Sequence, residues 1–83
     1  MEIVRHDCKT FTVLGQAIHL YSEVLESGRS TVAEINGQFH YLGTEYPTVS
    51  SAIFTWQDIN KRELTNEELR QVMIENNLIS QGI

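Results

Sequence analysis

The residues of this sequence that could carry chemistry begin with a histidine and a cysteine two positions apart, His6 and Cys8. Zinc prefers thiolate and imidazole ligands, and His19 and His40 could complete such a set. Their spacing, however, matches no zinc module. Cys8 could instead be a nucleophile with His6 or His40 as its base, but no third residue is placed to orient that base. We therefore predict neither a metal site nor a cofactor.

Acidic side chains and glycines lead to the same expectation. Glu67 and Glu68 are the adjacent carboxylates that acid–base chemistry could use. Their position fits the first turn of a helix, where carboxylates favour the positive end of the helix dipole. The five glycines are scattered along the chain and form no glycine-rich phosphate loop. The sequence therefore predicts a protein that is not an enzyme.

The strongest structural signal is the Asn36-Gly37 pair, which stands between two β-forming runs in the segment 31–42. Asparagine followed by glycine is the favoured loop of a two-residue β-hairpin, because both positions require positive φ. A loop of this length also sets the register of the two strands. The expected cross-strand pairs are Ile35 with Gln38, Ala33 with His40 and Thr31 with Leu42 on one face, and Glu34 with Phe39 and Val32 with Tyr41 on the other.

Helical spacing of apolar residues precedes and follows this hairpin. The segment 12–27 carries a stripe of apolar side chains and is followed by Gly28, which suits a left-handed helix end. A second helix is expected from Pro47, whose missing N–H is harmless in a first turn, with its last apolar residue at Ile59. A strand is the alternative for this second segment, although its apolar residues do not alternate.

A third helix is expected to begin at Thr65. Thr65 and Glu68 form the T-x-x-E capping box, and Leu64 and Leu69 can close a hydrophobic staple around it. The pair Asn76-Asn77 is expected to end the helix.

With a short strand over residues 2–6, these elements predict the order β-α-β-β-α-α. The expected fold class is α+β, with a small antiparallel sheet of the hairpin and the N-terminal strand packed against three helices. We expect one compact domain over residues 1–83, with a loose C-terminal tail at 79–83. The expected core consists of Ile3, Leu14, Ile18, Tyr21, Leu25, Val32, Tyr41, Ile53, Trp56, Leu69 and Val72.

Charge and composition narrow the classes of function. Eleven acidic and six basic side chains give a net charge of −5, which opposes extensive phosphate binding. The single cysteine excludes an internal disulfide and fits a reducing compartment. No apolar run resembles a signal peptide or a membrane span. We expect a cytoplasmic protein with no membrane partner and little affinity for nucleic acid.

DNA binding by the two C-terminal helices is the alternative function. Lys61 and Arg62 precede the last helix and Arg70 lies on it, so some positive charge is available there. The same helix would also place several carboxylates near phosphate, which opposes docking.

Contact with another protein is the function that we predict, as a small inhibitor, adaptor or regulator. The expected apolar stripes do not accommodate every aromatic side chain, and aromatic residues are enriched at the centres of interfaces. The predicted protein-binding residues are Phe39, Tyr41, Tyr46 and Phe54; the alternative is that these rings complete the core. An exposed hairpin edge could also pair two copies in a homodimer.

A helix, an Asn-Gly hairpin and two further helices in a compact acidic chain resemble the small accessory proteins of phages and mobile elements. Such proteins commonly act by binding and inhibiting or redirecting a host protein. The resemblance implies a binding role and assigns no site residues.

Overall fold

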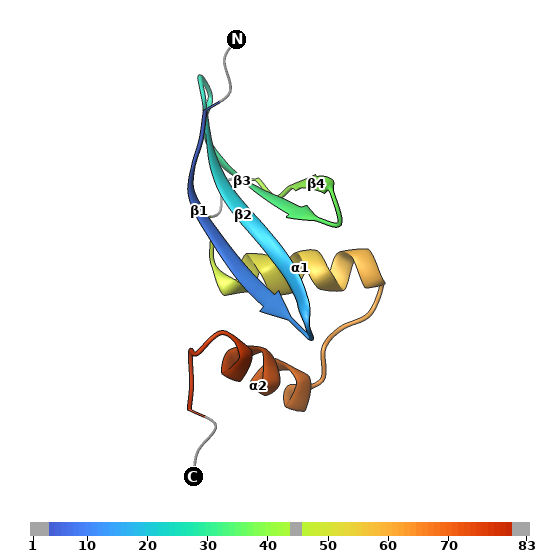
Figure 1. Ribbon diagram of the computed structural model, residues 1–83. Coiled ribbons are helices and arrows are strands. Elements are labelled where there is room, and N and C mark those ends of the chain that lie inside the picture. Colours follow the sequence, from blue (N-terminus) through green and yellow to red (C-terminus); the bar gives the residue numbers. More distant parts are fainter. Residues whose placement is uncertain (1–3, 44–45, 81–83) are drawn as a thin grey trace.

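The computed structural model describes residues 4–43 and 46–80 of the chain (Figure 1). Four strands precede two helices: β1 (Val4–Val13), β2 (Gln16–Leu25), β3 (Gly28–Ile35), β4 (Gln38–Tyr41), α1 (Val49–Asn60) and α2 (Asn66–Glu75). The strands form one antiparallel sheet in the order β1-β2-β3-β4. The fold is therefore α+β as predicted, but the predicted order β-α-β-β-α-α is wrong, because the segment 12–27 forms no helix and two helices are present in the described residues where three were expected.

The error lies in the segment 12–27, which forms the end of β1, a turn and strand β2 instead of a helix. Leu14 and Gly15 both have positive φ, 49° and 83°, and reverse the chain between the two strands. Along β2, burial alternates: Ile18, Leu20 and Ser22 are buried on one face. The apolar residues of this segment fit both a helical and an alternating pattern, and pairing with β1 and β3 selects the alternating one. Gly28 accordingly begins β3 and caps no helix.

The predicted hairpin is confirmed together with its register. Asn36 and Gly37 have φ values of 53° and 77°, as a two-residue loop of this type requires. Ile35 pairs with Gln38, and the next three predicted pairs follow in the predicted register. At the predicted pair Thr31–Leu42 the Leu42 N–H donates to the Thr31 carbonyl at 2.8 Å, but the Thr31 N–H donates to the Gly43 carbonyl at 2.8 Å, so a bulge ends the ladder there.

Strand β1 is longer than the predicted strand at 2–6 and contains a bulge. Its register with β2 shifts between His6 and Lys9, where Asp7 has a φ of 55°. A bulge leaves one residue unpaired and bends the strand. Ile3, which we expected in the core, lies outside the described residues.

The two helices predicted after the hairpin are both present, and each begins close to its predicted start. The side chain of Thr48 caps α1 by accepting from the N–H of Ser51, so Pro47 stands just before the cap and not in the first turn. The capping box of α2 is present: Glu68 N–H donates to the Thr65 hydroxyl and Thr65 N–H donates to the Glu68 carboxylate. Asn76 is the C-cap of α2, as predicted.

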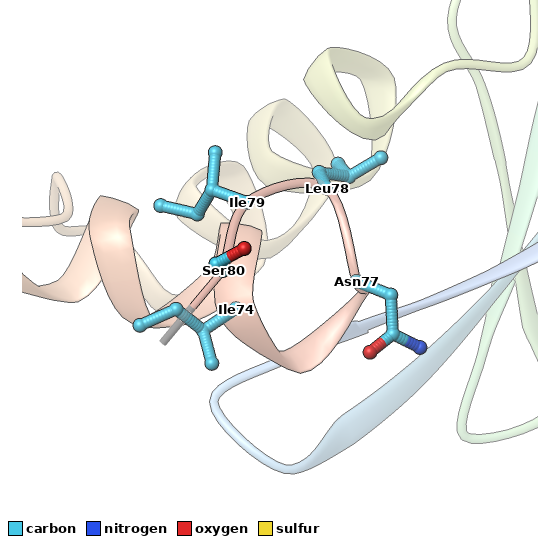
Figure 2. A pocket seen from close by; sticks show the side chains of 5 residues that line it. All are labelled: Ile74, Asn77, Leu78, Ile79 and Ser80. Atoms are coloured by element: carbon cyan, nitrogen blue, oxygen red, sulfur yellow. The ribbon is translucent and has the colours of Figure 1, made fainter. Parts of the chain in front are cut away.

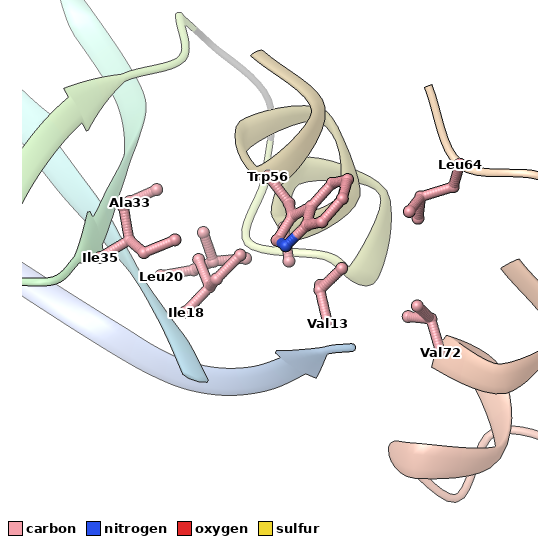
Figure 3. Close-up of a cluster of buried hydrophobic side chains, with 9 residues drawn as sticks. Val13, Ile18, Leu20, Ala33, Ile35, Trp56, Leu64 and Val72 are labelled. Carbon is pink, nitrogen blue, oxygen red and sulfur yellow. The ribbon is translucent and has the colours of Figure 1, made fainter. Parts of the chain in front are cut away.

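Helix α1 packs across β1, β2 and β3, and α2 packs beside β1, so one face of the sheet, which we call the core face, meets the helices (Figure 1). Figure 3 shows the core-face side chains directed toward Trp56 of α1, with Leu64 and Val72 facing each other farther along. The buried core consists of Val13, Ile18, Leu20, Ala33, Ile35, Ala52, Trp56, Leu64 and Val72.

Most of the expected core residues are at least half-buried, with one clear exception. Leu14, Ile53 and Leu69 pack against the core, and Tyr21 and Leu25 are half-buried. Tyr41 is 64% exposed, so its assignment to the core was wrong. The hairpin register places Tyr41 on the sheet face opposite the helices. Ile79, the first residue of the predicted tail, and Leu78 before it are exposed, and residues 81–83 of that tail lie outside the described residues.

Within residues 4–43 and 46–80, no helix combines the length and the apolar character needed to cross a membrane.

Candidate protein-interaction surface

The face of the sheet opposite the helices, the outer face, is covered by no other element of the described chain. Strand register decides which side chains lie there, because Ile18 and Leu20 of β2 face the core and their neighbours in the strand face outward. We call the central group on this face the outer-face cluster. It consists of Arg5, Tyr21, Glu23, Val32, Glu34, Phe39 and Tyr41.

Arg5 organises the outer-face cluster. Its Nε donates to the Glu23 carboxylate at 2.7 Å, and its guanidinium lies 4.6 Å from the centre of the Phe39 ring. Arg5 comes from β1 and Phe39 from β4, the two edge strands of the sheet. Because three strand spacings amount to about 14 Å, these two long side chains together bridge the width of the sheet. The hydrogen bond to Glu23 also raises the pKa of Arg5.

Beneath this bridge, two residues are buried although they lie on the outer face. Val32 is completely buried, with Tyr21 and Tyr41 beside it on the adjacent strands, and Glu23 is only 1% exposed. A buried carboxylate is costly unless it is paired, and Arg5 supplies the pairing cation. The centre of the cluster is therefore shielded from water by the cluster's own side chains.

A second side-chain hydrogen bond of the cluster joins β2 to β3. The hydroxyl of Tyr21 donates to the Glu34 carboxylate at 3.1 Å. This hydrogen bond is the main cause that raises the pKa of Tyr21, and the partial burial of the hydroxyl raises it further. Since the polar groups of the cluster bind one another, their side chains are held in place before any partner arrives.

Two of the four predicted binding residues lie together in this cluster. Phe39 is 43% exposed and Tyr41 is 64% exposed, so neither ring completes the core. Aromatic and arginine side chains are the residue types most enriched at energetically important interface positions. The cluster thus combines exposed rings with an arginine that is already positioned.

The other two predicted residues are exposed elsewhere. Tyr46 lies near the start of α1, with Arg29 6.0 Å from its ring centre. Phe54 lies on α1 and lines two hollows, one of about 280 Å³ with Leu42 and one of about 340 Å³ with Arg62. The structure therefore separates Tyr46 and Phe54 from the outer-face cluster.

Five residues of the cluster were not predicted as binding residues from the sequence: Arg5, Tyr21, Glu23, Val32 and Glu34. Tyr21 and Glu23 were placed on a helix, which hid their position beside the hairpin. The available signal was the alternation of His19, Tyr21 and Glu23 with the buried Ile18, Leu20 and Ser22.

The residues first considered for chemistry do not converge. Cys8 is exposed at the β1 bulge, and His6 Nδ1 lies 3.1 Å from the Asp7 carboxylate. His19 lies on the outer face beside Thr10, whereas His40 pairs with Ala33 of the core face. In the described part of the chain, no three His, Cys, Asp or Glu side chains are grouped so that they could hold a metal ion.

A hollow of about 440 Å³ lies beside the end of α2 (Figure 2). It is lined by Ile74, Asn77, Leu78, Ile79 and Ser80. No charged side chain lines it, and all of its lining residues come from one short segment, residues 74–80. Its size alone does not indicate a ligand site.

The basic residues that DNA binding by α1 and α2 would use are largely paired with carboxylates. Arg62 donates twice to the Glu68 carboxylate, at 2.8 Å each, and Lys61 lies 4.0 Å from Asp58. The hydrogen bonds from Arg62 and from Thr65 N–H lower the pKa of Glu68 to about 2. Arg70 is exposed, with Glu67 three positions before it on α2.

In comparisons with known proteins, no family model, no curated protein and no solved structure matches this chain.

Proposed function

We propose that this protein is a non-enzymatic protein-binding module, a small inhibitor, adaptor or regulator that occupies a surface of its partner with the outer face of its sheet. The observation that supports this proposal is the outer-face cluster, in which two exposed aromatic rings stand beside an arginine held by Glu23. The proposal includes the role that the resemblance implied, that of a cytoplasmic accessory protein acting on a host protein.

The mechanism is steric occupation by a surface that is already ordered. Arg5 and Tyr21 are each tied to a carboxylate, so binding would immobilise few additional side chains. A preorganised surface loses less entropy on association and therefore binds more tightly for the same contacts. The net charge of −5 favours a partner with a basic rim, which would accelerate encounter at low salt.

We place DNA binding by α1 and α2 second. Its candidate cations Lys61 and Arg62 already have acidic neighbours, and phosphate would have to compete with Glu68 for the guanidinium. A fluorescence titration with duplex DNA at low salt separates the two proposals. Binding that weakens steeply with added salt would favour the DNA proposal.

The protein proposal is tested by affinity capture from a nuclease-treated lysate of the native host, with two matched double variants. Phe39→Ala/Tyr41→Ala removes the exposed rings of the outer-face cluster. Phe54→Ala/Tyr46→Ala removes one phenylalanine and one tyrosine of similar exposure elsewhere. We expect the first variant to lose the captured protein and the second to retain it.

The captured protein is then purified and titrated against each variant. Truncating residues at an interface centre costs about 2 kcal/mol or more, which is about a 30-fold increase in Kd. Thermal unfolding of both variants confirms that they are folded. Equal affinity of the two variants, or loss with Phe54→Ala/Tyr46→Ala alone, would refute binding through the outer face.

A further inference from the structure

The two edge strands of the sheet, β1 and β4, differ in whether other parts of the chain bind their outward backbone groups. At the β1 edge, the side-chain amide of Asn76 occupies the place of a neighbouring strand. Its Oδ1 accepts from Thr12 N–H and its Nδ2 donates to the Thr12 carbonyl, each at 2.8 Å. The Glu75 carboxylate accepts from the N–H groups of Leu14 and Gly15 in the adjoining turn. At this end of β1 the outward backbone groups are therefore not free to pair with another strand.

The remainder of the β1 edge is interrupted by the bulge at Asp7. Bulges, charges and covering elements are the usual means by which proteins prevent edge strands from pairing with other chains. Strand β1 therefore carries two such devices, the bulge and the capping side chain of Asn76.

Within its four residues strand β4, at the other edge, carries neither device, and the bulge at this edge comes only after it, at Leu42 and Gly43. Its sequence, Gln38-Phe39-His40-Tyr41, contains no lysine, arginine, carboxylate or proline. Beyond β3, no strand within residues 4–43 and 46–80 pairs with it. The main contacts of helix α1 are with β1, β2 and β3, and near this edge Leu42, the residue after β4, lines a hollow with Ser51 and Phe54 of α1.

The hairpin register shows which backbone groups this edge presents. In a two-residue hairpin the pair that closes the loop, here Ile35 and Gln38, is hydrogen-bonded, and bonded pairs then alternate along the ladder. Ala33 and His40 form the next bonded pair. At the following position the Leu42 N–H donates to Thr31, but the Thr31 N–H donates to Gly43, so the regular ladder ends there in a bulge. The N–H and C=O groups of Phe39 and Tyr41 consequently point away from β3.

We propose that two copies of this chain pair through β4, antiparallel, about a two-fold axis at His40, to form a continuous eight-stranded sheet. Phe39 of one copy then faces Tyr41 of its partner, and the reverse. Each such pair can exchange two backbone hydrogen bonds, since both residues present N–H and C=O outward. The register that centres on Phe39 instead would oppose Tyr41 to Gly37 of the hairpin loop and lose one aromatic contact.

A second copy suits this edge better than an acidic or basic strand because β4 is uncharged. Two chains of net charge −5 repel each other, and an uncharged edge is where they can approach most closely. The carboxylate of Glu34, the residue that pairs with Phe39 across the hairpin, already accepts the Tyr21 hydroxyl. Aromatic cross-strand pairs of the kind formed by Phe39 and Tyr41 stabilise antiparallel sheets.

The dimer would bring the two outer-face clusters side by side in one surface. The pairing itself does not depend on the proposed function. It needs no other protein for its test, so a monomeric result leaves the capture experiment intact, and a failed capture leaves the dimer intact.

The first test uses the unmodified protein. Light scattering after size exclusion is expected to give a mass that rises with concentration from the 9.5 kDa of one chain toward twice that value. Amide hydrogen exchange should slow at Phe39 and Tyr41 as concentration rises. The His40 amide, bonded within the hairpin, should be protected at every concentration. A mass of 9.5 kDa up to the solubility limit, or exchange at Phe39 and Tyr41 that never slows, overturns the proposal.

The second test uses a matched pair of variants. Tyr41→Lys places a charge on the β4 edge, and Tyr46→Lys changes a tyrosine of nearly the same exposure, 65% against 64%, away from that edge. We expect Tyr41→Lys to weaken dimerisation at least tenfold and Tyr46→Lys to leave it unchanged. A dimer that persists equally in both variants uses another surface and refutes the pairing.

The register is tested by disulfide trapping in a Cys8→Ser background. In a non-hydrogen-bonded antiparallel pair the two residues lie close enough for a disulfide to form. Under mild oxidation His40→Cys should therefore form a covalent dimer. Gln38→Cys should not, because two copies of this residue lie about four residues apart along the strands, roughly 13 Å. Cross-linking through Gln38→Cys alone would refute the His40-centred register.

Discussion

The change of Asn76 to aspartate tests how helix α2 is held against the sheet. Asn76 makes three hydrogen bonds of 2.8 Å: its Oδ1 accepts from Thr12 N–H, and its Nδ2 donates to the carbonyls of Thr12 and Val72. Aspartate has the same shape and keeps the acceptor. It loses both donors and turns a carboxylate oxygen toward two carbonyl oxygens.

The magnitude follows from the bonds that are lost. A neutral hydrogen bond contributes about 1 kcal/mol net, so two lost bonds cost about 2 kcal/mol. Repulsion between the carboxylate and the carbonyls adds to this cost, while the charged acceptor strengthens the remaining bond, and we take these two effects to cancel. For a domain of this size 1 kcal/mol corresponds to about 4–8 °C in Tm, so the expected decrease is about 8–16 °C.

Asn77→Asp is the matched control. It introduces the same charge at the same end of α2, where a negative charge is unfavourable to the helix dipole. Asn77 has a φ of 60°, a conformation that aspartate tolerates, and it is exposed. The difference between the two variants therefore isolates the hydrogen bonds of Asn76.

Urea and thermal unfolding at neutral pH, followed by circular dichroism, measure this difference. Faster exchange of the Thr12 amide in Asn76→Asp would locate the change at the β1 edge. If the two variants unfold within about 0.5 kcal/mol of each other, less than a typical single hydrogen bond, then these bonds do not hold the helix and the reasoning is wrong.

Three further predictions concern stability. The pKa of Glu68 lies at about 2 instead of 4.5, so its stabilising effect is complete above about pH 4.5 and is lost as the pH falls through about 2. Urea unfolding should therefore show that the loss of stability in Glu68→Gln, relative to the unmodified protein, becomes smaller as the pH falls from about 4.5 to about 2. Glu67→Gln should show no such trend. Gly37→Ala should cost about 1 kcal/mol in the same assay, because φ is +77° there; an unchanged midpoint would contradict the turn geometry. Arg5→Met should unfold at lower urea than Arg5→Met/Glu23→Gln, because the single change leaves the buried Glu23 carboxylate unpaired; the reverse order would show that the ion pair does not organise the outer face.

The parts of the fold that could be predicted from the sequence are those specified by short-range backbone chemistry. Asn36-Gly37 supplies two consecutive residues that tolerate positive φ, and a two-residue loop leaves one register for the strands that it joins. Thr65 and Glu68 satisfy each other's backbone N–H groups whatever else surrounds them. These features recur in the structure as predicted because they involve residues only a few positions apart.

The segment 12–27 could not be assigned in this way. Its apolar residues suit a helix as well as a strand, and the choice depends on backbone partners contributed by β1 and β3. Once β2 is a strand, Tyr21 and Glu23 move to the face that carries the hairpin's aromatic rings.

The candidate surface, too, was predictable only in the part that local backbone geometry specifies. By itself the sequence placed Phe39 and Tyr41 on one face of a hairpin, since local turn geometry settles alternation and register. Only the tertiary structure brought Arg5 from the opposite edge strand over Phe39, buried Glu23 beneath it and left this face without a helix. Those contacts join residues far apart in the chain, and no local rule of backbone conformation specifies them.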